Sequence, residues 1–227
     1  MNQEIIPIQL KLPYRMGNVN CYLAKTGTGV ILVDTGSPKN CVELETELDQ
    51  AGCNSTNLRL IILTHGDFDH TGNAAYIKKK YNAKIAMHPE DSQMVEQGDM
   101  FLNREKGNFI QSWIVKTLFG FGKSRRFKPD VEVTDGFDLT EYGLDARVIH
   151  IPGHSKGSIG VLTSDGQLIC GDLFENTNEN DSPKINSLMD DLEEAKRSIN
   201  KLNNLKINNV YPGHGRSFRM DSFVLKS

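Results

Sequence analysis

Residues 64–73 follow a short apolar segment directly, and they place four potential metal ligands within six positions. The apolar segment, residues 58–64, has the length expected for a buried strand. A metal site is therefore expected where a rigid strand ends. Imidazole and carboxylate donors suit zinc, iron or manganese, and no cysteine lies in the cluster to favour a thiolate site. The four candidate ligands are His65, Asp67, Asp69 and His70.

The same turn also has a purely structural interpretation, because Asp and Gly often cap helices and residues 71–73 look like a helix start. Three further turns favour metal binding, since each follows a predicted strand and carries a potential ligand next to glycine. Four of the six histidines then lie in glycine-flanked turns after strands. The three turns are Pro152-Gly153-His154, Cys170-Gly171-Asp172 and Pro212-Gly213-His214-Gly215.

The order of these motifs, with Val33-Asp34-Thr35-Gly36 upstream, resembles the metallo-β-lactamase superfamily over residues 19–218. The family's first motif is usually His-x-His-x-Asp-His, and Asp67 stands where the second histidine is usual. The resemblance implies an α/β fold, a four-layer αββα sandwich in which loops from both sheets meet at two divalent metal ions. Zinc is the first expectation for these ions, and the hard carboxylate of Asp67 shifts the preference toward iron or manganese.

The resemblance also implies a role for each motif residue. Asp69 would accept a proton from the attacking water, besides binding metal. Asp34 would support the site from behind the ligands. The implied ligands are His65, Asp67 and His154 for the first metal, Asp69, His70 and His214 for the second, and Asp172 as a bridge between the two.

Length, charge and cysteine spacing limit the domain count, the partners and the cellular location that the chain can be expected to have. A chain of 227 residues can bury a substantial core, so residues 1–227 are expected to form a single domain. A formal charge of −3 does not indicate a nucleic-acid partner. Neither a signal peptide nor a transmembrane segment is recognisable, so a cytoplasmic protein is expected. The four cysteines lack CxxC spacing and are expected to be free thiols.

Hydrophobic periodicity and turn residues predict strand-rich segments followed by a helix, and this order occurs twice along the chain. Such a repeat indicates two similar halves. The predicted strands are 5–12, 19–25, 29–34, 58–64, 83–87 and 208–211, with short β-like segments over 131–171. The predicted helices are 38–51, 74–81, 90–97 and 188–202.

The segment 98–128 departs from this pattern, because it combines seven Lys or Arg residues and two acidic ones with apolar residues at helical spacing. In one interpretation this helical insert packs on the domain. In another it is a lid over the metals, where Phe109, Trp113 and Arg125 would line a site for a small amphipathic, anionic substrate. A homodimer contact or a membrane-surface contact is the third interpretation.

Three functions fit these features. The first is a dinuclear metal-dependent hydrolase, similar to the glyoxalase II-like branch, in which a water bridging the metals attacks a small ester, thioester or lactone. A phosphodiester is less favoured. The second is an oxidoreductase similar to persulfide dioxygenases, with one iron held by His65, His154 and Asp172. The third is a non-catalytic metal-binding module.

Overall fold

The computed structural model describes residues 4–102, 104, 125–177 and 182–224. Its first sheet has the strand order β1-β2-β3-β4-β5-β6. Strands β1 to β3 pair antiparallel, and β3 to β6 pair parallel. The bounds are β1 (Glu4–Lys11), β2 (Asn18–Lys25), β3 (Val30–Val33), β4 (Leu58–Ile62), β5 (Lys84–Met87) and β6 (Val131–Glu132).

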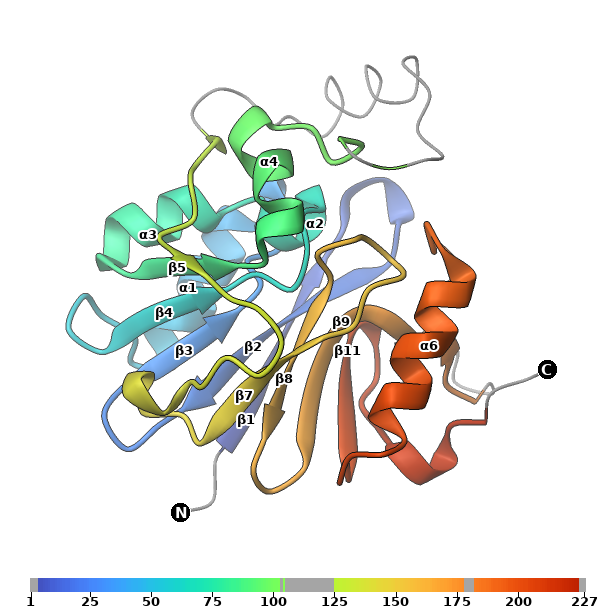
Figure 1. Cartoon of the computed structure of the whole chain (residues 1–227). Helices are drawn as coiled ribbons and strands as arrows, with labels where there is room; N and C mark the ends of the chain where they lie inside the picture. The colour runs from blue at the N-terminus through green and yellow to red at the C-terminus, as the bar shows by residue number, and fades with distance from the viewer. Residues whose placement is uncertain (1–3, 103, 105–124, 178–181, 225–227) are drawn as a thin grey trace.

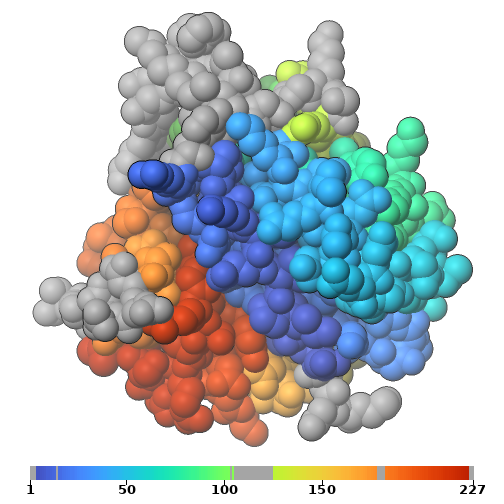
Figure 2. Space-filling model, turned by 180° about the vertical axis from the view of Figure 1, so that it is seen from behind, coloured from blue at the N-terminus to red at the C-terminus, as the bar shows by residue number. Residues whose placement is uncertain are grey.

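The second sheet has the order β12-β11-β9-β8-β7, and β10 pairs with β9 at its side. Its bounds are β7 (Ala146–His150), β8 (Ile159–Thr163), β9 (Gln167–Asn176), β10 (Lys184–Ile185), β11 (Asn209–Gly215) and β12 (Phe218–Arg219). The helices are α1 (Cys41–Gln50), α2 (Phe68–Thr71), α3 (Ala74–Tyr81), α4 (Pro89–Gln97) and α6 (Leu192–Leu202). The N-terminal and C-terminal halves occupy opposite sides of the molecule (Figure 2).

The sheets face each other, with α1, α3 and α4 on the outer side of the first and α6 on the outer side of the second (Figure 1). This is the four-layer αββα sandwich expected from the sequence. Three apolar layers hold it together, one between the sheets and one under each set of helices. Strand β4 shows why its sequence is continuously apolar. Ile61 faces the helices while Leu60 and Ile62 face the other sheet, because successive side chains alternate. Leu58 also faces the helices, because the pairing with β3 shifts register between Leu58 and Leu60.

Helix α6 buries Ala195, Ile199 and Leu202 against the second sheet. The sequence predicts this helix from residue 188, but it begins at Leu192. The reason is the carboxylate of Asp191, which accepts a hydrogen bond from the Glu194 amide at 2.9 Å and so caps the first turn. The sequence predicts a helix over residues 38–51. Residues 38–40 instead form a 3₁₀ turn, and α1 begins after it at Cys41.

Most of the insert 98–128, including Phe109 and Trp113, lies outside the described residues. The four cysteines are free thiols, as expected. No helix in the described part of the chain is both long enough and apolar enough to cross a membrane.

Candidate metal centre

Potential ligands from four separate motifs converge at one edge of the two sheets. Within each of two groups, the ligand atoms lie within 4.8 Å of one another. All of these side chains are buried except those of Asp69 and His214, which are partly exposed. One group is His65, His154 and Asp172, and the other is Asp69, His70 and His214.

The first motif supplies ligands to both groups because the chain turns into a short helix inside it. Strand β4 ends at Ile62, and α2 begins at Phe68 with Asp67 as its N-cap. The helix start predicted at 71–73 is confirmed, because α3 begins at Ala74 with Asn73 as its N-cap. The short α2 before it was not predicted. The hydroxyl of Thr71 closes the turn by donating to the Asp67 carbonyl at 2.9 Å.

Asp34 lies behind the ligands and orients two of them. Its Oδ1 accepts from the Thr64 amide at 2.8 Å, and its Oδ2 accepts from His70 Nδ1 at 2.8 Å. The Thr64 hydroxyl also donates to Oδ2, at 2.8 Å, and therefore accepts from His65 Nδ1 at 2.9 Å. Asp34 adopts φ 62°, a left-handed conformation uncommon outside glycine, which indicates a backbone held in place by its surroundings.

Backbone carbonyls orient the other two histidines in the same way. His154 Nδ1 donates to the Leu188 carbonyl and His214 Nδ1 to the Asn18 carbonyl, both at 2.7 Å. With Nδ1 protonated in all four rings, each Nε2 offers its lone pair to the centre. This is the tautomer that metal-binding histidines need.

Asp172 lies between the two groups. Its Oδ1 is 3.3 Å from His70 Nε2, and its Oδ2 is 3.3 Å from His214 Nε2 and 3.9 Å from His154 Nε2. Burial raises the pKa of Asp172, but His214 and His70 outweigh it and hold this pKa well below its usual value. Gly213 is needed here because a Cβ at that position would lie 2.1 Å from Asp172 Oδ1.

The charge and the unpaired atoms of the centre fit divalent cations. Four aspartates are at least nine-tenths buried, and within the described residues the cation in contact with them is Arg104. His65 Nε2, His70 Nε2 and Asp172 Oδ1 are buried and make no hydrogen bond to a described residue. Lone pairs oriented into a negatively charged, buried space are the donor set that a metal ion satisfies. The four aspartates are Asp34, Asp67, Asp69 and Asp172.

Asp67 differs from the other ligand candidates in its partner. Its Oδ1 accepts from an Arg104 terminal nitrogen at 2.5 Å, while its Oδ2 lies 3.1 Å from His154 Nε2 and 3.7 Å from His65 Nε2. Sequence reasoning missed Arg104, counting it only among the basic residues of the insert. The one signal was indirect: a carboxylate at a position that usually holds a neutral histidine needs a compensating charge.

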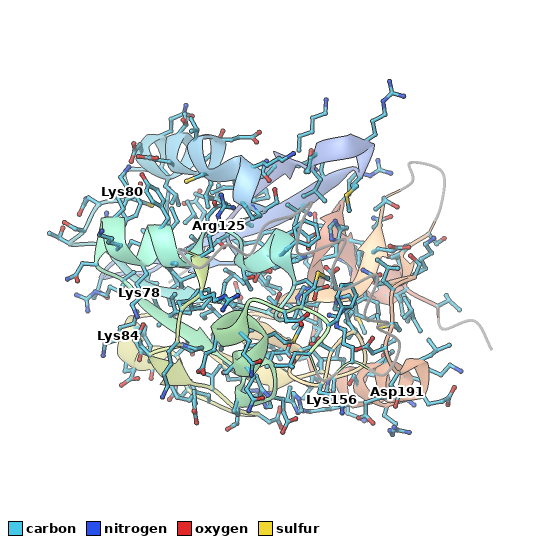
Figure 3. The ribbon with its side chains drawn as sticks, turned by 90° about the horizontal axis from the view of Figure 1, so that it is seen from above. Lys78, Lys80, Lys84, Arg125, Lys156 and Asp191 are labelled. Atoms are coloured by element: carbon cyan, nitrogen blue, oxygen red, sulfur yellow. The ribbon has the colours of Figure 1, made fainter. Side chains whose placement is uncertain are left out.

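The two remaining histidines lie outside the ligand groups, in agreement with their absence from any motif. His88 and His150 stack with ring centroids 4.2 Å apart. Burial and the neighbouring His150 lower the pKa of His88 to about 4. Both rings line a hollow of about 430 Å³, and so do Lys156 and Asp191, which lie near each other in Figure 3.

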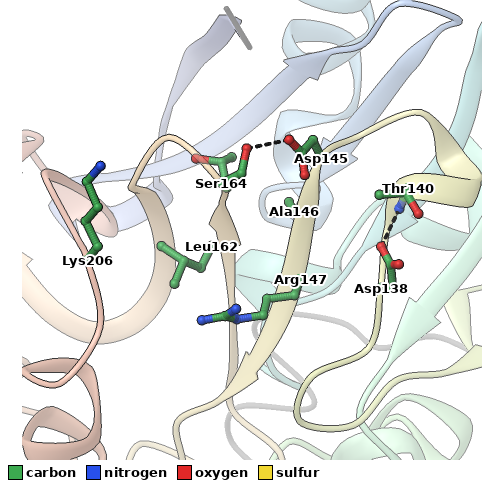
Figure 4. A pocket seen from close by; sticks show the side chains of 9 residues that line it. Asp138, Thr140, Asp145, Ala146, Arg147, Leu162, Ser164 and Lys206 are labelled. Carbon is green, nitrogen blue, oxygen red and sulfur yellow. Dashed lines mark hydrogen bonds between the residues drawn. The ribbon is translucent and has the colours of Figure 1, made fainter. Parts of the chain in front are cut away.

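Two other features lie away from the centre. A hollow of about 380 Å³, lined by Asp138, Arg147 and Ser164 among others, lies where β7 begins and β8 ends, opposite the His154 end of β7 (Figure 4). Arg125, predicted to line the substrate site, lies close enough to Cys41, at the start of α1, to affect the pKa of that thiol. Burial and Glu45 raise this pKa overall, and the charge of Arg125 lowers it in part. Its substrate role, like those of Phe109 and Trp113, stays a prediction.

Comparisons with known proteins agree with this arrangement. A family model described as the metallo-β-lactamase superfamily matches residues 14–214. A probable metallo-hydrolase of Methanocaldococcus jannaschii is 29% identical over 204 residues, which is 86% of this chain and 87% of that protein. A hydroxyacylglutathione hydrolase of Haemophilus influenzae is 27% identical over 166 residues, which is 71% of this chain and 66% of the other.

Solved structures show the same fold. A metallo-β-lactamase family protein of Thermus thermophilus superposes with a TM-score of 0.71 at 25% identity, covering 96% of this chain and 76% of that one. A second structure, of a protein in a di-iron-bound form, has a TM-score of 0.68 at 24% identity and covers 95% of both chains.

Proposed function

The chain belongs to the metallo-β-lactamase superfamily, and from this premise we propose that it is a dinuclear metal-dependent hydrolase of small esters, thioesters or lactones. The observation that carries the proposal is the pair of ligand groups, each with lone pairs directed at a common space. Zinc is the first candidate metal, with iron or manganese as alternatives. We assign His65, Asp67 and His154 to the first position, Asp69, His70 and His214 to the second, and Asp172 to both.

Two such metals, when bound, lower the pKa of a water molecule and polarise the carbonyl oxygen of the substrate. The chain's own residues supply the rest of the chemistry. Asp69 Oδ2 lies 3.5 Å from His214 Nε2, beside the space that the two groups share. A general base must lie beside the water whose proton it accepts, and a carboxylate at this position fits that role. We therefore assign Asp69 as general base.

The substrate class rests on two lines of support. Relatives named hydroxyacylglutathione hydrolases favour a thioester over a phosphodiester. Leu188, whose carbonyl orients His154, has a 72% exposed side chain and can contact the apolar part of a small substrate. We therefore favour an acyl compound with an apolar portion.

The test begins with metal content per chain, measured by plasma mass spectrometry on protein purified without added metal or chelator. About two equivalents followed by turnover of a thioester, ester or lactone would support the proposal. Asp69→Ala is expected to abolish turnover in a folded protein, whereas Asp138→Ala, at the remote hollow of Figure 4, serves as the matched control. Unchanged activity in Asp69→Ala would remove its assigned role. A chain that takes up no metal even when refolded with Zn, Mn or Fe would contradict the hydrolase and indicate a degenerate, non-catalytic site.

One observation favours a second candidate. His65, His154 and Asp172 form a group of two histidines and one carboxylate, the ligand set of mononuclear iron oxygenases. One equivalent of iron, together with oxygen uptake on a glutathione persulfide that His154→Ala lacks, would move this candidate to first place. The equally well-formed group around His70 supports the hydrolase instead, because a mononuclear enzyme leaves that group without a use.

A further inference from the structure

A buried ion pair occupies the place in the centre where a neutral ligand is usual. The side chains of Asp67 and Arg104 are only 8% and 9% exposed, and their closest atoms are 2.5 Å apart. The Arg104 guanidinium also reaches Asp190, with Nε 3.4 Å from Oδ2. Two carboxylates therefore hold the guanidinium, which fixes it behind Asp67.

The two oxygens of Asp67 have different partners. Oδ1 faces the guanidinium, whereas Oδ2 faces His65 Nε2 at 3.7 Å and His154 Nε2 at 3.1 Å. Ligand atoms about 2.0–2.1 Å from one tetrahedral metal lie about 3.3 Å apart, a value between these two distances. Oδ2 thus stands in a ligand position.

The contact with His154 points to a cation as well. His154 Nδ1 donates to the Leu188 carbonyl, so in the neutral ring the lone pair of Nε2 faces the Asp67 oxygen. Two acceptors 3.1 Å apart repel each other unless a positive charge lies between them. The contact between Asp67 and His154 therefore marks a place that a cation would stabilise.

Charge explains why Arg104 is needed. A histidine ligand is neutral, whereas a carboxylate adds one negative charge to a buried space that already holds Asp172. The guanidinium returns the local charge to the value that an imidazole would give. The reverse also holds: a guanidinium that loses Asp67 keeps only the longer contact with Asp190. Its charge beside a divalent metal is then poorly compensated, which is unfavourable.

We propose that Asp67 and Arg104 act as one unit that takes the place of a neutral histidine at the first metal position, so that positions 67 and 104 are matched. Arg104 is a positioning residue, because it acts on the metal through Asp67. The proposal rests on the proposed function only in that the first position holds a metal ion.

A double-mutant cycle with Asp67→His, Arg104→Met and both together tests the match. The readouts are metal equivalents per chain and the Kd of the more weakly held Zn²⁺ in chelator competition, with no substrate present. Asp67→His alone should keep about one equivalent, because the guanidinium, left with the Asp190 contact alone, repels the ion at the first position. The double variant should regain two, with a Kd at least tenfold lower than that of the single variant. Arg147→Met, at an exposed position on β7, is the matched control.

Two results would overturn the match. In the first, Asp67→His binds two metals as tightly as the double variant does. In the second, both the single and the double variant bind only one equivalent. If Asp67→His does not fold, Asp67→Asn removes the same charge with little change in shape and carries the same expectation, with and without Arg104→Met. The cycle measures metal binding and not turnover. If a separate assay showed that the wild type binds two metals but hydrolyses nothing, the proposed hydrolase would be contradicted, and the cycle would still test the match between positions 67 and 104.

Discussion

The two proposed metal positions share the first motif but are supported in opposite ways. At the second position a carboxylate supports a histidine, because Asp34 accepts from His70 at 2.8 Å. At the first position a guanidinium supports a carboxylate, because Arg104 donates to Asp67. The difference teaches that the charge of a ligand set is adjusted by the residues behind it. A carboxylate behind a ligand favours a bound cation and a guanidinium opposes one, so the first position should hold its metal less tightly.

Chelator titration should have the largest effect and tests this comparison directly. Activity is expected to vanish completely and to return when metal is added back. Release should occur in two steps, with the first-position metal leaving at the lower chelator concentration because Arg104 lies close to it. The measurement is metal retained per chain after dialysis against increasing chelator. Release of both ions in one step, with equal affinity, would break the comparison.

Asp172→Ala should have the next largest effect, because Asp172 is the residue that we assign to both positions. Its oxygens lie 3.3 Å from ring nitrogens of His70 and His214. Both metals are expected to bind more weakly by more than about 100-fold, which exceeds the loss seen on changing a supporting residue. Titration calorimetry on the metal-free variant gives the two affinities. An intact first position in Asp172→Ala would show that the residue is not shared.

Asp34→Asn should weaken one position selectively. The amide nitrogen of asparagine cannot accept the hydrogen bond from His70 Nδ1, so this ring loses its preferred tautomer. A loss of about 10–100-fold is expected at the second position, with a smaller loss at the first, which Asp34 reaches only through Thr64. Asparagine tolerates the left-handed backbone, so the fold should persist. Equal weakening of both positions in calorimetry would contradict the distinction.

A smaller effect is expected from the residues that hold the ligand loops. Asn20 donates to the carbonyls of Pro212 and Gly215, at 3.0 and 2.8 Å, and so fixes the loop of His214. Ser155 donates to Asp91 at 2.6 Å beside His154. Asn20→Ala should weaken only the second position and Ser155→Ala only the first, each by about tenfold at most. Each variant is the other's control. A loss at the first position in Asn20→Ala, or at the second position in Ser155→Ala, would contradict the assignment of the His214 and His154 loops to these positions.

Much of this arrangement was accessible from the sequence, because it depends on local patterns. The continuous apolar run of β4 predicts a strand buried on both faces, and glycine beside His154 and His214 predicts turns that carry ligands. What the sequence could not reveal depends on tertiary approach. Arg104 reaches Asp67 across 37 residues of chain, and the carbonyl of Leu188 orients His154 without any signature in residue type.

The smallest effect should come from an ion pair far from both positions, and it tests whether the metal measurements are specific. Lys78 lies 2.6 Å from Asp130, which also accepts from the Ile85 amide at 2.8 Å. Partial burial raises the pKa of Asp130, but these two contacts outweigh it and lower this pKa. The folded pKa is below the unfolded value of about 3.9, so the stabilisation is present above that pH and is lost as the pH falls through the folded pKa.

Lys78→Met should therefore lower the free energy of unfolding near neutral pH by about 0.5 kcal/mol, because the pair is partly exposed and screened by water. The deficit should shrink in acid, where Asp130 becomes protonated in both proteins. Urea unfolding of the metal-free proteins across this pH range measures it without interference from metal release. Lys78 lies on α3 with Lys80, away from Lys156 and Asp191 (Figure 3), so both metal affinities should stay unchanged. A change in either affinity would mean that the two positions respond to the stability of the whole fold, and the contrast between Asp34 and Arg104 would then lose its local explanation.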